Sequence, residues 1–278
     1  MAVTDSARAM AQPIEAAGRQ VAPVVATLAR IGHLASALVY ATIGTLAARA
    51  ALGEGGGTTD THGALRAVLH APLGQALLGV CAVGFAGNGL WRLVDAVTDA
   101  EQHGPGLKGA AARVRTVFVA IAQGALALAA FRLATGGRDS GGHGSSRVAA
   151  GLLDLPGGQW LTLAVGLAVV GYGLYQIYRG AIAKLDRRLD LASLPAGTSR
   201  WVIPVCRVGI AARGVVAGLV GVLLSRAALR HDPGAAGGIR ESLQMVARTG
   251  RWPLAVVAVG LIAFAVYQLV RARYRRLA

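Results

Sequence analysis

Apolar residues along this chain gather in six long blocks instead of alternating with polar residues. Each block is close to the about 17–25 residues that an α-helix needs to cross the hydrocarbon core of a bilayer. Leu, Val, Ala and Gly dominate the blocks, which favours helices over barrel strands. The pattern therefore predicts an all-α integral membrane protein with six transmembrane helices. The predicted spans are Ile31–Ala48, Leu73–Trp91, Thr116–Phe131, Trp160–Tyr178, Val208–Leu224 and Trp252–Val270.

The composition supports this class. Only 15% of the 278 residues are charged, whereas a soluble domain carries about 25%. The net charge of +15 would suit a nucleic-acid ligand, but the charges lie in the short segments between the apolar blocks. Most of them fall on one side if the N-terminus is cytoplasmic, so the positive-inside rule places both termini in the cytoplasm and argues against nucleic acid. We expect a terminal cluster to rest on anionic lipid headgroups. It contains Arg271, Arg273, Arg275 and Arg276.

The six spans repeat as three tandem pairs. After a cytoplasmic tail at residues 1–29, the predicted two-span units cover residues 30–96, 110–180 and 205–272. In the first span of each unit, arginine marks both ends at one spacing: Arg30 and Arg49, Arg113 and Arg132, Arg207 and Arg226. In the second span, small residues recur in register: Gly84 and Gly87, Ala168 and Gly171, Gly260 and Ala263.

The first spans also share a pair of small residues four positions apart. Such a pair lies on one helix face and lets another backbone approach closely, which is how helices associate in lipid. Three pairs in register predict a common packing seam. They are Ala37 and Ala41, Ala120 and Gly124, and Gly214 and Gly218.

Two-span units begin and end on the same side, so successive copies share one orientation and are related by rotation about the membrane normal. We therefore expect a six-helix bundle with pseudo-threefold symmetry. Between the two spans of a unit lies a Gly-rich link and a short amphipathic piece, as at residues 63–69 and 239–243. These pieces are predicted either to lie flat on the outer leaflet or to cap the bundle.

The unit resembles a known bacterial membrane family. Its features here are an Arg-x-Gly start, the run Gly63-Ala64-Leu65-Arg66-Ala67-Val68-Leu69, then Pro72-Leu73-Gly74 and a Gly-rich span ending in Leu90-Trp91-Arg92. This pattern resembles domain of unknown function 1206 over nearly the whole chain. The resemblance implies tandem two-helix units, three to a protein, and brings no established activity. Arg213-Gly214-Val215-Val216 matches the family's Arg-Gly-Val-Val run, whereas Ser36 and Val119 replace the arginine in the other two units.

Arg213 is the main polar candidate because it lies well inside an apolar span. Two readings stay open: its side chain snorkels to the cytoplasmic interface, or it faces the bundle, where an intramembrane charge marks a partner or a ligand. Asp95 is a candidate partner, although Arg92, three residues away, is its simpler mate. Three glutamines, Gln123, Gln176 and Gln268, are interpreted as interhelical hydrogen-bonding groups, with a substrate site as the alternative.

Other chemistry finds little support. Cys81 and Cys206 are expected to be free thiols, because they lie at different depths and the inner side is reducing. The spacing of His and Cys matches no metal site and no haem pair. No nucleophile has a base beside it in sequence, so we expect neither an enzyme nor a cofactor.

Two functional hypotheses follow. In the first, the protein is a structural or accessory component of the bacterial cytoplasmic membrane that binds lipids or partner membrane proteins. In the second, the bundle encloses a path for a small solute or an anion, with Arg213 selecting the charge. The small number of intramembrane polar groups favours the first.

Overall fold

The computed structural model describes residues 27–28, 30–54, 57–98, 106–137, 144–182 and 199–274, and the regular structure in these ranges is helical. The tail predicted at residues 1–29 thus lies outside the described residues except for Thr27 and Leu28, and so do Arg275 and Arg276. The first helix covers Arg30–Leu52. It is followed by α2 (Thr61–Leu69), α3 (Gly74–Thr98), α4 (Leu107–Ala134), α5 (Gly144–Leu153), α6 (Gly158–Ile182), α7 (Ser199–Arg230), α8 (Ile239–Thr249) and α9 (Arg251–Tyr274).

Six of these helices are long and apolar enough to cross a membrane, which confirms the predicted number of spans. They are the first helix, α3, α4, α6, α7 and α9. The main difference in extent concerns α7, which begins at Ser199 and contains Pro204. The hydropathy pattern missed this first part because Arg200 and Arg207 interrupt it.

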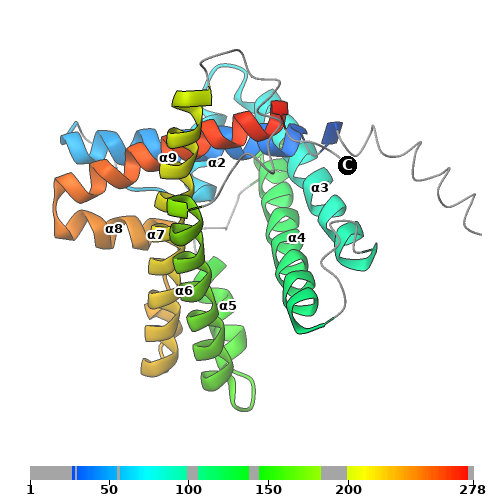
Figure 1. The fold of residues 1–278 in the computed structure, drawn as a ribbon, viewed down its shortest axis with the longest axis vertical. Helices are drawn as coiled ribbons and strands as arrows, with labels where there is room; N and C mark the ends of the chain where they lie inside the picture. The colour runs from blue at the N-terminus through cyan, green and yellow to red at the C-terminus, as the bar shows by residue number, and fades with distance from the viewer. Residues whose placement is uncertain are drawn as a thin grey trace, which may run out of the picture.

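The long helices pack as neighbouring pairs (Figure 1). α3 packs along α4, α6 along α7, and α7 also against α9. The first helix packs on α9, since a Cβ added at Gly44 would lie 3.0 Å from the carbonyl oxygen of Ala258. By contrast, α4 and α6 are not among the helix pairs in extensive contact.

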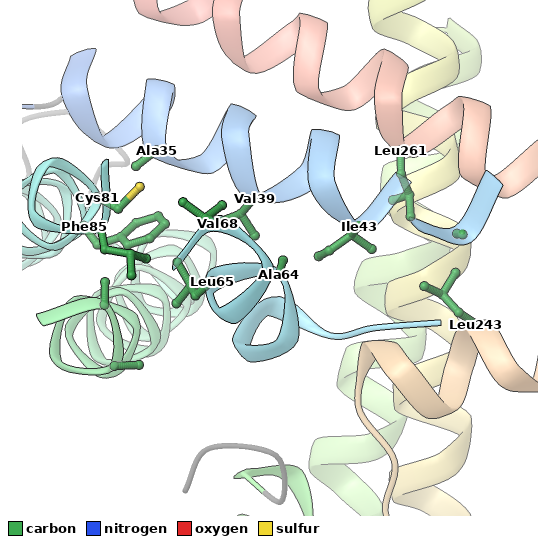
Figure 2. Close-up of a cluster of buried hydrophobic side chains, with 14 of the residues drawn as sticks. Ala35, Val39, Ile43, Ala64, Leu65, Val68, Cys81, Phe85, Leu243 and Leu261 are labelled. Atoms are coloured by element: carbon green, nitrogen blue, oxygen red, sulfur yellow. The ribbon is translucent and has the colours of Figure 1, made fainter. Parts of the chain in front are cut away.

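A buried apolar core lies where the short helices meet the spans, which we call the hairpin end (Figure 2). Its largest side chains are at most 1% exposed and come from the first helix, α2, α3, α8 and α9: Ile43, Leu65, Leu78, Phe85, Leu243 and Leu261. Burial of this apolar surface fixes the short helices to the spans.

The two amphipathic pieces pack against the long helices through their apolar sides. On α2, Leu65 and Val68 are buried, and Asp60 caps the helix by accepting a hydrogen bond from the Gly63 amide at 2.8 Å. On α8, Leu243 is buried, and the Gly238 amide donates to Oε2 of Glu241 at 2.7 Å. Each cap satisfies a backbone N–H that the first turn leaves unpaired.

Both cysteines are free thiols and buried, as predicted. Cys81 lies in the core at the hairpin end, and Cys206 packs with Ile210 and Phe264 between α7 and α9. Each therefore serves as a small apolar residue.

Candidate functional site

Arg213 points into the protein. Its guanidinium donates a hydrogen bond from Nε to the Tyr40 hydroxyl at 3.2 Å and another from Nη1 to the Tyr172 hydroxyl at 2.9 Å. Tyr40 belongs to the first helix and Tyr172 to α6. The side chain thus ties α7 to two other long helices.

Aromatic rings complete the surroundings of this guanidinium. Its central carbon lies 5.2 Å from the centre of the Phe264 ring on α9 and 5.9 Å from that of Tyr172. Tyr40 also packs edge-on against Phe264, with ring centres 4.7 Å apart. We call Arg213, Tyr40, Tyr172 and Phe264 the arginine cage.

The cage offsets the cost of placing a charge in an apolar protein. Hydrogen bonds from a charged donor contribute about 1.5–3 kcal/mol each, and a cation–π contact contributes about 0.5–2 kcal/mol. No described carboxylate forms an ion pair with Arg213. Its positive charge is therefore solvated by hydroxyls and aromatic faces and is not neutralised by them.

Small residues beside the cage bring the helices close enough to form it. A Cβ added at Gly173 would lie 2.7 Å from the carbonyl oxygen of Gly214 and 2.6 Å from the nitrogen of Gly218. Because α6 and α7 touch backbone to backbone here, Tyr172 reaches the residue that precedes Gly214.

The same contact recurs between α3 and α4. A Cβ added at Gly89 would lie 3.2 Å from the carbonyl oxygen of Ala120 and 3.6 Å from the nitrogen of Gly124. In the repeat register, Gly89 corresponds to Gly173, and Ala120 and Gly124 correspond to Gly214 and Gly218. In the remaining pair of the seam, Ala37 is buried and Ala41 is half-buried.

The other predicted residues lie apart from the hydrogen bonds of the cage. Gln176 and Gln268 are buried at 5% and 7% exposure, whereas Gln123 and Arg92 are half-buried. The predicted interhelical hydrogen bond is absent at Oε1 of Gln123 and of Gln268, which have no partner in the described part of the chain. Asp95 lies in α3, but its side chain is outside the described part, so its pairing with Arg213 or Arg92 stays a prediction.

The three aromatic partners of Arg213 are not among the residues predicted from the sequence. Tyr172 and Phe264 correspond to each other in the repeat register, one residue after Gly171 and Ala263, and the first unit has Asn88 there. A signal was therefore present: two of the three units carry an aromatic residue at one position of the second span.

Comparison with known proteins places these residues in a family. A family model described as Domain of Unknown Function (DUF1206) matches the chain three times, at residues 31–99, 103–183 and 208–275. The chain belongs to the DUF1206 family. Over 257 residues it is also 28% identical to the uncharacterized protein YxxB of Bacillus subtilis (strain 168), covering 92% of this chain and 93% of that protein. No solved structure matches the chain.

The three DUF1206 matches meet at the arginine cage. Tyr40 lies in the first match, Tyr172 in the second, and Arg213 and Phe264 in the third. Because one side chain contacts all three, the cage links units that the sequence presents one after another.

Proposed function

We propose that this DUF1206 protein is a structural or accessory component of the bacterial cytoplasmic membrane that binds lipids or partner membrane proteins. The observation that carries the proposal is the apolar surface of α4 and α6. Large side chains there are more than half exposed, and in a bilayer such a surface meets lipid chains or another apolar helix. They include Phe118, Ile121, Leu167 and Leu174.

The proposal includes three units arranged around a pseudo-threefold axis. A Cβ at Gly221 would lie 2.6 Å from the nitrogen of Val170, and one at Gly44 would lie 3.0 Å from that of Ile262. These two contacts correspond in the repeat register, so α9 meets the first helix as α6 meets α7. Three equivalent helix pairs related by rotation account for this correspondence.

The same arrangement places both termini in the cytoplasm, which reporter fusions can test. We expect one set of fusions to be active outside and the other inside, because an even number of spans returns the chain to its starting side. An inner segment found outside would break the two-span unit. The outside set is Gly56, Gly141 and Ala236, and the inside set is Gly104, Ala196 and the C-terminus.

Passage of an anion past Arg213 is the second candidate function. The uncompensated guanidinium favours it, since a fixed positive charge attracts anions. The core at the hairpin end weighs against it, because the side chains packed there, such as Ile43, Leu243 and Leu261, are apolar and buried. A solute would have to displace them, so we favour the accessory role.

Site-specific photocrosslinking in membranes tests the accessory role. A photoreactive residue at Phe118 on α4 or Leu167 on α6 is expected to capture lipid or a membrane protein, because both side chains face outward. The matched control is Phe85, which is 1% exposed and should capture only this chain. Crosslinks at Phe118 and Leu167 that stay within the chain would contradict the proposal.

Flux measurements separate the two candidates. Liposomes containing the purified protein are expected to leak chloride and phosphate at the rate of protein-free liposomes, with no effect of Arg213→Gln. Fast flux that depends on Arg213 would replace the accessory role with the second candidate. On this proposal the protein also catalyses no reaction, so lipid turnover that stops when Arg213 or Asp95 is changed would contradict it.

A further inference from the structure

The arginine cage leaves donors of Arg213 without a partner. A guanidinium has five N–H groups in a planar fork that suits the oxygens of a phosphate or carboxylate. Only Nε and Nη1 donate within the described structure, each to a tyrosine hydroxyl. No described residue therefore accepts a hydrogen bond from Nη2 or balances the positive charge of Arg213.

The two long helices of the second unit, α4 and α6, lack the close backbone contact that the two long helices of the first and third units make. In the first unit, a Cβ at Gly32 would lie 2.6 Å from the carbonyl oxygen of Gly84 on α3. In the third, a Cβ at Gly209 would lie 2.4 Å from the nitrogen of Phe264 on α9. The second unit has Arg115 at the corresponding sequence position, and α4 and α6 are not among the helix pairs in extensive contact.

Because α4 does not pack closely on α6, part of the α6 surface beside Tyr172 is exposed. Tyr172 corresponds to Asn88 and Phe264, the residues that pack on Gly32 and Gly209. The neighbouring Gly171 is exposed, and a Cβ there would have nothing within 4 Å. At the equivalent Gly87, a Cβ would lie 2.6 Å from the Leu28 side chain. Arg213 thus donates to a tyrosine that lies next to an exposed position of α6.

We propose that Arg213 binds the phosphate of an anionic membrane lipid, which reaches the arginine cage from the bilayer between α4 and α6. The lipid supplies the negative charge that the described residues do not, and its acyl chains lie against the apolar surface of the two helices. Inorganic phosphate offers the same oxyanion from water and is the alternative source. This inference rests on the proposed lipid-binding role and names the lipid class and the residue that selects it.

Native mass spectrometry of the full-length protein in detergent tests the site. Phosphatidylglycerol is expected to bind the wild type at least tenfold more tightly than it binds Arg213→Gln, and diacylglycerol with the same chains should show no such difference. The matched control is Arg226→Gln, which removes an exposed guanidinium from the same helix and should bind like the wild type. Equal phosphatidylglycerol binding by Arg213→Gln and the wild type would overturn the proposal.

Two further variants keep the arginine and guard against a folding defect. Tyr172→Phe removes one acceptor and frees Nη1, so it should bind phosphatidylglycerol at least as tightly as the wild type. Gly171→Leu fills the uncovered position and should weaken lipid binding more than threefold. Its control is Gly79→Leu, which adds a side chain at another open position, on α3. Lipid binding that is lost in Tyr172→Phe, or unaffected by Gly171→Leu, contradicts entry beside Tyr172.

The source of the phosphate is decided by a parallel measurement. The Tm of the wild type, Gly171→Leu and Arg213→Gln is measured with and without inorganic phosphate. The ligand comes from water, and the lipid proposal fails, if phosphate stabilises the first two but not Arg213→Gln and phosphatidylglycerol binding does not depend on Arg213. Crosslinking of lipid at Phe118 does not involve Arg213. It therefore reports on the accessory role separately from this site.

Discussion

Replacing Arg213 by leucine is expected to destabilise the protein by about 2 kcal/mol. The change leaves the hydroxyls of Tyr40 and Tyr172 without the donor that they accept from, and a buried polar group that loses its partner costs about 1–3 kcal/mol. It also removes two cation–π contacts. Leucine also avoids the desolvation cost of a buried charge, which offsets part of this destabilisation. The net change in the free energy of unfolding is therefore smaller than the sum of the lost contacts.

Thermal unfolding in detergent measures this effect, with Arg226→Leu as the control. Arg226 is exposed on the same helix, and a surface change of this kind alters stability by about 0.5 kcal/mol or less. The double change of Tyr40 and Tyr172 to phenylalanine should make Arg213→Leu nearly neutral, because no hydroxyl then loses the hydrogen bond from Arg213. An unchanged Tm for Arg213→Leu alone would show that the cage contributes nothing to stability.

The sequence predicted the membrane-spanning helices well because their signal is one of composition. A block of apolar residues long enough to cross a bilayer has few alternatives, and the six predicted spans lie within long helices except for Leu73, which precedes α3. The packing seam could also be predicted from the sequence. Gly214 and Gly218 form a close backbone contact with Gly173, as a pair of small residues four positions apart suggests.

The direction in which the Arg213 side chain points could not be predicted from composition or from the spacing of small residues. α7 is apolar around most of its circumference, so hydrophobicity does not determine which face meets the other helices. The partners lie far away in sequence, on the first helix, α6 and α9. Nor did the sequence reveal that α4 and α6 lack extensive contact, because how closely two helices approach depends on packing far along the chain.

Substituting alanine for Gly173 is expected to destabilise the protein strongly, although it adds only one methyl group. The added Cβ would lie 2.6 Å from the nitrogen of Gly218 and 2.7 Å from the carbonyl oxygen of Gly214. Both neighbours are backbone atoms of α7, so α6 and α7 must separate along their whole contact. Overpacking costs about 1–3 kcal/mol where side chains can adjust, and we expect about 3 kcal/mol here.

A series of glycine variants isolates this cause. Gly171→Ala lies on the same helix with nothing within 4 Å of its Cβ, and alanine is the better helix former by about 1 kcal/mol, so its Tm should be unchanged or higher. Gly89→Ala, 3.2 Å from the carbonyl oxygen of Ala120, should fall between the two. Separation of α6 from α7 would also move the exposed position Gly171 of α6 away from Arg213, so Gly173→Ala should lose phosphatidylglycerol affinity as well. If Gly171→Ala and Gly173→Ala unfold at the same temperature, the backbone contact between α6 and α7 does not hold this pair together.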